Sequence, residues 1–174
     1  VPAWRWRVAA STGVGGLWSR TFCGISRGKM GHVAYPLRAD NPVAKLASFL
    51  DRISRIALDG VNAHFDPSSM SITSFDVGNM ATNVIPSRAT AKFNIRYNTE
   101  HTPQSLKSLI SLHADAVKAE LGGAWNVVAY EGADVFITQP GPFVKLVQEA
   151  VHAETGVMPK LSTSGGTSDA RFVK

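Results

Sequence analysis

Cysteine is nearly absent from this sequence of 174 residues, which contains only Cys23. A single cysteine excludes an internal disulfide bond and a cysteine-rich zinc site, and it fits a reducing, cytoplasmic compartment. The sequence also lacks any apolar run of the roughly 18 residues that a membrane-spanning helix requires. With 44% apolar and 18% charged residues, the chain can instead bury the core of one ordinary domain or slightly more.

Acidic residues are missing from the first 30 positions, which carry five basic residues. The rest of the chain balances 13 basic residues against 13 acidic ones, so this segment alone produces the formal net charge of +5. The charge therefore does not indicate a nucleic-acid-binding surface. Three of the four tryptophans (Trp4, Trp6 and Trp18) also lie here, without helical or strand periodicity. We therefore expect residues 1–27 to be an aberrant, non-native segment, such as the product of a shifted reading frame.

Six elements are predicted between Gly28 and residue 131, in the order strand, helix, strand, strand, helix, strand. They are a strand in "GKMGHVAYP", a helix at 42–58 capped by Asp40 or Asn41, strands at 70–78 and 89–97, a helix at 103–121 and a strand at 125–130. This order is typical of an α+β, ferredoxin-like βαββαβ domain, which we place at residues 28–135. Its two helices would cover one face of an antiparallel sheet and leave an edge free for dimerisation.

Residues 136–174 predict a third helix, from Pro142 to a stop at Gly156, followed by a short strand and the loop "STSGGTSDARF". The helix carries an apolar stripe of Phe143, Leu146, Val147 and Val151, but no sheet of its own is predicted to cover it. We therefore expect a partial segment of a second domain, with disorder or aggregation in this region.

Few residues stand out for chemistry. The five histidines have neither HxH nor HxxxH spacing and no carboxylate at ligand spacing, so no metal site is predicted. His113 lies on a helix stripe and should be partly buried, whereas His64, His101 and His152 should be solvated. His32 follows a glycine in "GHVAYP", and Asn83 stands beside a proline turn, where it could equally form an Asx turn.

Two further features suit anions. Arg96 projects from the polar face of its strand, as a solvated cation or as a partner for a substrate carboxylate. The loop "SGGTSDARF" offers backbone N–H groups, hydroxyls, Asp169 and Arg171 at a helix start, which fits an anion or substrate loop.

Three segments together, "GKMGHVAYPLRADNP", "GNMATNVIPSRATAKFNIRYNTEHTP" and "LSTSGGTSDARF", resemble the bacterial succinyl-diaminopimelate desuccinylases. These enzymes belong to the dinuclear zinc aminoacylase and carboxypeptidase clan. The resemblance covers roughly residues 28–174. It implies hydrolysis of N-succinyl-L,L-2,6-diaminopimelate to succinate and L,L-diaminopimelate, in lysine and cell-wall synthesis. It also implies two zinc ions, with cobalt as a possible substitute, and a glutamate general base.

The resemblance further implies a homodimer whose active sites are completed in trans. His32 would reach the partner's active site and stabilise the oxyanion, and Asn83 would bind substrate across the interface. Tyr35 would lie near the small-molecule substrate, and Arg96 would hold one of its carboxylates. The pocket lining implied for the last loop consists of Gly166, Thr167 and Ser168.

The family's metal ligands have no counterpart at these positions, so we expect an incomplete piece that binds no metal and is inactive by itself. Residues 136–174 would then be part of the α/β zinc-hydrolase catalytic domain. Two alternatives are another deacylase or carboxypeptidase of the same clan, and a non-catalytic dimerisation module. Neither a nucleic acid nor a membrane is an expected partner.

Overall fold

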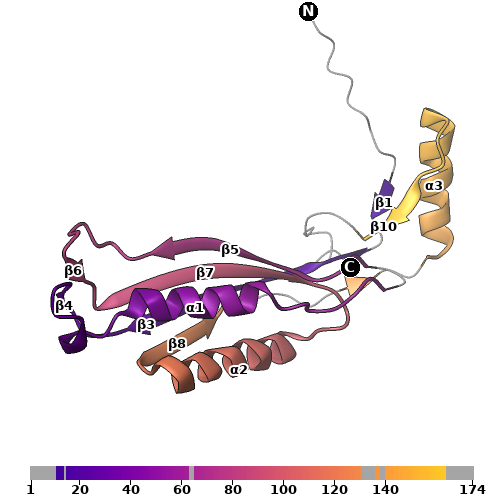
Figure 1. Cartoon of the computed structure of the whole chain (residues 1–174). Coiled ribbons are helices and arrows are strands. Elements are labelled where there is room, and N and C mark those ends of the chain that lie inside the picture. The colour runs from indigo at the N-terminus through magenta and orange to yellow at the C-terminus, as the bar shows by residue number, and fades with distance from the viewer. Residues whose placement is uncertain (1–10, 14, 63–64, 131–135, 138–139, 164–174) are drawn as a thin grey trace, which may run out of the picture.

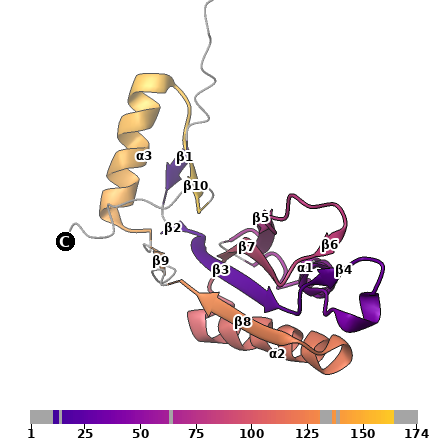
Figure 2. The same cartoon turned by 90° about the vertical axis from the view of Figure 1, so that its left-hand side faces the viewer.

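A computed structural model describes residues 11–13, 15–62, 65–130, 136–137 and 140–163. Four of its strands form one antiparallel sheet in the order β5-β7-β3-β8. These strands are β3 (Trp18–Arg27), β5 (Ser69–Asp76), β7 (Arg88–Tyr97) and β8 (Ala124–Ala129). Helices α1 (Pro42–Ser54) and α2 (Pro103–Leu121) lie side by side against one face of this sheet (Figures 1 and 2). The predicted α+β class and the βαββαβ order are thereby confirmed.

Both helices begin where local capping chemistry predicts. The Asn41 side chain accepts a hydrogen bond from the Val43 N–H at 3.0 Å, and Pro42 occupies the first turn. Thr102 and Ser105 form a reciprocal capping box ahead of α2, with distances of 2.9 and 3.0 Å. Because such caps need only residues three or four positions apart, the sequence is enough to find them.

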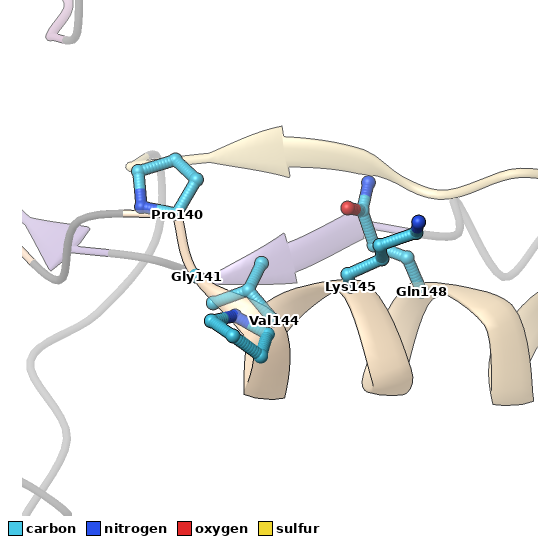
Figure 3. A pocket seen from close by; sticks show the side chains of 6 residues that line it. Pro140, Gly141, Val144, Lys145 and Gln148 are labelled. Carbon is cyan, nitrogen blue, oxygen red and sulfur yellow. The ribbon is translucent and has the colours of Figure 1, made fainter.

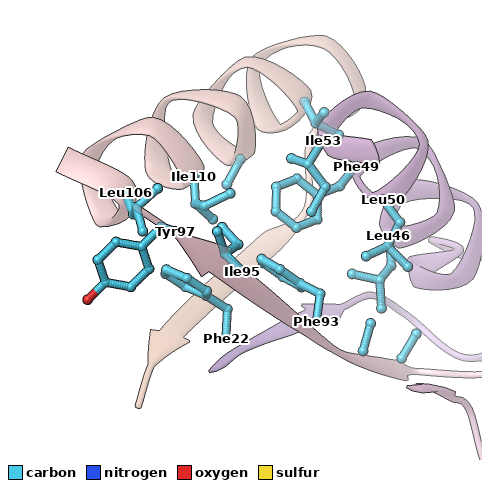
Figure 4. Packing of buried hydrophobic residues seen from close by; sticks show 14 of the residues in the cluster. Phe22, Leu46, Phe49, Leu50, Ile53, Phe93, Ile95, Tyr97, Leu106 and Ile110 are labelled. Atoms are coloured by element: carbon cyan, nitrogen blue, oxygen red, sulfur yellow. The ribbon is translucent and has the colours of Figure 1, made fainter. Parts of the chain in front are cut away.

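The core lies between the helices and the sheet. Phe22 of β3 stacks on Phe93 of β7 with ring centroids 5.2 Å apart, and Phe49 of α1 meets Phe93 edge-on at 6.1 Å (Figure 4). Leu106 and Ile110 of α2 close the other side, where they are essentially inaccessible to solvent. Each such side chain stabilises the fold by roughly 1.5–3 kcal/mol relative to leaving it exposed.

The first strand of the sheet is not the one predicted. Only Gly31–His32 of "GKMGHVAYP" form a strand, β4, which pairs with β6 (Val84–Ile85) outside the main sheet; a short 3-10 helix, η1 (Pro36–Arg38), follows. The sheet instead begins with β3, inside the segment expected to be non-native. It pairs with β7 over its whole length, from Trp18 to Arg27. The four-stranded sheet therefore includes residues that precede the domain boundary predicted at Gly28.

A smaller group of elements involves residues near both ends of the chain. Strand β1 (Ser11–Gly13) pairs in parallel with β10 (Lys160–Ser162), and β2 (Gly15–Gly16) pairs antiparallel with β9 (Phe136–Ile137). Helix α3 (Pro142–Thr155) lies beside β1 and ends at Gly156 in a left-handed conformation, as predicted. The strand after α3, β10, therefore pairs with β1, a partner that the sequence did not predict.

The apolar stripe predicted on α3 is largely uncovered, as the absence of a predicted sheet implied. Val144 is the buried side chain, whereas Phe143 and Leu146 are 75% and 61% exposed. Val147 and Val151 are half-buried. No helix among the described residues is long and apolar enough to cross a membrane.

Candidate functional site

His32 and Asn83 meet at one end of the molecule, although 51 positions separate them in the sequence. Antiparallel pairing of β4 with β6 sets His32 opposite Val84, and the Val33 N–H donates to the Asn83 carbonyl oxygen at 3.1 Å. The Asn83 Nδ2 atom consequently lies 3.5 Å from His32 Nε2. Both side chains are exposed. Two of the predicted site residues thus form a pair that an incoming ligand can reach.

The loop that carries His32 is closed at its base. Lys29 and Asp40 exchange two backbone hydrogen bonds of 2.9 Å, and the Asp40 carboxylate pairs with the nearly buried Lys45 of α1. Gly28 packs so tightly against this bridge that a Cβ there would overlap the Asp40 carbonyl oxygen. These contacts tie the His32 loop to the first turn of α1.

Tyr35 lies beside the histidine, as expected. Its N–H donates to the His32 carbonyl oxygen at 2.9 Å, and the two ring centroids are 6.2 Å apart. The Arg38 guanidinium stands 5.4 Å from the Tyr35 ring centroid. Tyr35 and His32 therefore form one exposed surface with Arg38 behind the phenol ring.

The Asn79 side chain organises the other half of the site. The amide Nδ2 donates to the carbonyl oxygens of Ala81 and Val84 at 3.1 and 2.8 Å, and Oδ1 accepts from the Ala81 N–H at 3.3 Å. These bonds span the turn in which Asn83 lies. The signal available in the sequence was the pair of asparagines in "GNMATNV", since asparagine favours such side-chain-to-backbone turns.

Arg96 is not brought together with the His32–Asn83 pair. It lies on the half-buried polar face of β7, opposite Ser19 of β3 and Ser69 of β5. Eight residues of strand separate it from Arg88, the β7 end that follows β6, which is roughly 27 Å at about 3.4 Å per residue. A single copy of the chain therefore presents two separate groups of predicted site residues.

The remaining predicted positions lie elsewhere. Gly166, Thr167, Ser168, Asp169 and Arg171 fall outside the described residues. Within the part of the chain that the structure describes, no three His, Cys, Asp or Glu side chains gather as a metal site would require. The described residues therefore do not fit a dinuclear zinc centre.

Two other histidines, His101 and His113, lie in partly buried surroundings. His113 is half-buried on α2, as predicted. The solvated position predicted for His101 is wrong: its side chain is 15% exposed, with Nε2 3.1 Å from the Leu58 carbonyl oxygen and 3.3 Å from the Asp59 carboxylate.

A hollow of about 450 Å³ lies at the start of α3 (Figure 3). Helix α3 is at the opposite end of the molecule from β4 and β6 (Figure 1). Lys145 and Gln148 project from the same side of the helix there, beside Pro140 and Val144. Gln148 is occupied in holding Pro159, since its Nε2 donates to that carbonyl oxygen at 2.9 Å. Of the predicted site residues that the structure describes, none lines this hollow.

Comparison with known proteins identifies homologues. The peptidase dimerisation domain family matches residues 11–121. The succinyl-diaminopimelate desuccinylase of Rhodospirillum centenum is 50% identical over 147 residues, which is 84% of this chain and 37% of that protein. The enzyme of the same name from Cereibacter sphaeroides (strain ATCC 17029 / ATH 2.4.9) is 50% identical over 149 residues, 86% of this chain and 39% of that protein. The chain spans less than two-fifths of the length of these relatives.

Solved structures share the fold at lower identity. A hydantoinase/carbamoylase-family amidase from Burkholderia vietnamiensis superimposes with a TM-score of 0.75 over 94% of this chain and 38% of its own, at 15% identity. A tripeptidase from Staphylococcus aureus gives a TM-score of 0.69 over 93% of this chain and 42% of its own, at 25% identity. The family match also begins at residue 11 and therefore includes β3. Sequence, topology and comparison agree that the chain belongs to the peptidase dimerisation domain family and is homologous to the succinyl-diaminopimelate desuccinylases.

Proposed function

We propose that this chain is part of a cytoplasmic zinc-dependent amide hydrolase. It would supply the dimerisation domain of that enzyme and, through residues 136–174, part of its catalytic domain. Its substrate would be N-succinyl-L,L-2,6-diaminopimelate, cleaved to succinate and L,L-diaminopimelate. The observation that carries the proposal is the exposed His32–Asn83 pair, in a chain that is 50% identical to succinyl-diaminopimelate desuccinylases. The proposed assembly is a homodimer in which this pair completes the active site of the partner.

Each residue has a chemical task in this proposal. The His32 N–H donates to the amide oxygen as it gains negative charge during attack on the carbonyl carbon. Asn83 and Tyr35 contact the substrate beside it. Arg96 binds a substrate carboxylate through its planar, two-pronged guanidinium. Residues 166–168 line the same pocket through backbone N–H groups and hydroxyls.

Zinc, or cobalt in its place, would supply Lewis-acid chemistry when bound. The described residues contain no cluster that fits it, so its ligands would come from other parts of the complete enzyme.

Completion of the site in trans is supported by the layout of the chain. His32 is exposed on β4, which pairs with β6, whereas Arg96 lies roughly 27 Å along β7 from Arg88, the end of that strand that follows β6. One small substrate cannot touch both residues of the same copy. In a two-fold symmetric dimer, however, the His32 of one subunit can meet the Arg96 of the other, and two equivalent sites result.

Mixing two variants tests this arrangement. A full-length hydrolase that carries this segment would be made as His32→Ala and, separately, as Arg96→Ala. We expect each variant alone to lose roughly 10²–10³-fold in kcat/KM. After unfolding and refolding together, half of the dimers are mixed, and each mixed dimer holds one intact site. Activity should then return to about a quarter of the wild-type value.

The control is refolding each variant alone, which should restore nothing. If the mixture also stayed inactive while mixed dimers were present by mass spectrometry, His32 and Arg96 would act in one polypeptide and the trans site would be wrong. Comparing succinylated with acetylated diaminopimelate in the same enzyme separates the desuccinylase from another deacylase. The purified chain alone should show no hydrolysis if the proposal is right.

A further inference from the structure

The contacts of the His32 ring determine which of its nitrogens carries a proton. The backbone N–H of Ala34 donates to His32 Nδ1 at 3.1 Å. A ring nitrogen that accepts a hydrogen bond has a free lone pair and carries no proton. The neutral ring therefore holds its single proton on Nε2, which is the nitrogen that faces Asn83.

The Asn83 amide must then turn its oxygen toward the ring. Asn83 Nδ2 and the protonated Nε2 are both donors, so the 3.5 Å approach between them is not a hydrogen bond. A carboxamide exchanges its nitrogen and oxygen positions by a half-turn about its last bond. The Ala34 N–H has no such freedom, because it is a main-chain group between Val33 and Tyr35, whose own N–H groups are bonded at 3.1 and 2.9 Å.

We propose that Ala34 and Asn83 act as positioning residues for His32: the Ala34 N–H fixes the Nε2–H tautomer, and Asn83 Oδ1 accepts from that N–H and aims it. The role in the reaction rests on the proposed function. There, an incoming substrate oxygen takes the place of Asn83 Oδ1 on the same proton. Because the donor is present in the neutral ring, His32 can assist the reaction without a positive charge.

The tautomer can be observed in the chain as it exists, without substrate or metal. Long-range ¹H–¹⁵N correlation spectra of the ¹⁵N-labelled chain distinguish protonated from bare ring nitrogens. The spectra would be recorded at alkaline pH, about two units above the ordinary histidine pKa of about 6.5. His32 is assigned by its disappearance in His32→Gln. We expect a protonated Nε2 and a bare, hydrogen-bonded Nδ1; a protonated Nδ1 would overturn the proposal.

Two pairs of variants test the positioning residues separately. Ala34→Pro removes the backbone N–H, so the population of the Nε2–H tautomer should fall and the Nδ1 resonance should shift. Ala34→Gly keeps the N–H and should leave the tautomer population and the Nδ1 resonance unchanged. Asn83→Leu removes the acceptor and should speed exchange of the Nε2 proton with water, whereas Asn83→Asp should keep that exchange slow. Unchanged ring signals of His101 and His113 show that the fold is intact.

Unchanged His32 signals in Ala34→Pro would refute the role of Ala34, and unchanged exchange in Asn83→Leu would refute the role of Asn83. If Ala34→Pro fails to fold, the proposal is still tested by the tautomer of the unchanged chain and by the substitutions of Asn83, whose side chain is exposed. These measurements involve no catalysis. A protonated Nδ1 together with restored activity in the mixing experiment would therefore count against this inference alone. A protonated Nε2 together with an inactive mixture would count against the proposed function alone.

Discussion

Two glycines at the base of the His32 loop are needed for the close packing of the chain there. Gly28 and Gly31 both lie against the returning chain, where added Cβ atoms would meet the Asp40 carbonyl oxygen and, at 2.7 Å, the Ala39 Cβ. The carboxylate of Asp40 meanwhile holds Lys45 on α1. Small residues in "RGKMGH" are therefore needed so that two backbone segments can approach closely.

Gly28→Ala tests this close approach. The new methyl group would overlap the Asp40 carbonyl oxygen and lie 2.9 Å from Pro42 Cδ, so the loop or the start of α1 must shift. We expect a loss of roughly 1–3 kcal/mol in the free energy of unfolding, measured by urea denaturation. Gly60→Ala is the matched control, since its Cβ meets nothing within 4 Å, and it should change stability by no more than about 0.5 kcal/mol. Equal effects of the two substitutions would disprove the close contact.

At the scale of elements, strand β3 holds the sheet together. It lies between β7 and β8 and bonds to both, and α1 and α2 pack on the face that these strands share. Phe22 supplies the ring that stacks on Phe93 in the core. Without β3 the sheet would consist of a β5–β7 hairpin and a separate β8.

Deleting residues 1–27 therefore decides between two accounts of this segment. If β3 is the central strand, the truncated chain should lose its cooperative thermal unfolding transition, because two-stranded sheets are marginal in water. Deleting residues 1–10 only, which leaves β3 intact, should keep the transition. A 28–174 chain that unfolded cooperatively at the midpoint of the complete chain would instead favour the account in which the segment is foreign to the domain.

At the scale of the whole molecule, the exposed apolar side chains of α3 favour self-association. Phe143 and Leu146 lie three positions apart on one side of the helix and are 75% and 61% exposed. The neighbouring Val144 is buried. Apolar side chains on a helix surface favour contacts between copies of the chain.

The double substitution Phe143→Ser and Leu146→Ser should reduce species larger than a dimer in sedimentation velocity, with a change in unfolding free energy within about 0.5 kcal/mol. Val144→Ser is the opposite case: it should cost roughly 1.5–3 kcal/mol, because a buried valine side chain is lost. If the double variant destabilised the chain as much as Val144→Ser does, Phe143 and Leu146 would have to be buried in solution.

The sequence by itself determined where the helices of this protein begin, the strand β7 and the approximate order of elements; α1 ends at Ser54, four residues before the predicted end. The start of α1, both ends of α2 and the Gly156 stop of α3 follow from caps and apolar spacings that span three or four residues. The alternation of Ala89, Ala91, Phe93, Ile95 and Tyr97 likewise predicts a half-buried strand, and all five are buried. The motifs also pointed to His32, Asn83 and Arg96 as candidates.

Only the tertiary structure decided which strand is central and which candidates meet. β3 could not be predicted from an alternating pattern, because three consecutive residues in its centre, Phe22, Cys23 and Gly24, are all buried. Its conformation depends instead on hydrogen bonds to β7 and β8, which are distant in the sequence. The His32–Asn83 pair depends in the same way on β4 meeting β6, and Arg96 is kept apart by the length of β7. Caps and periodicity act between near neighbours in the chain, whereas strand partners are chosen by the fold as a whole.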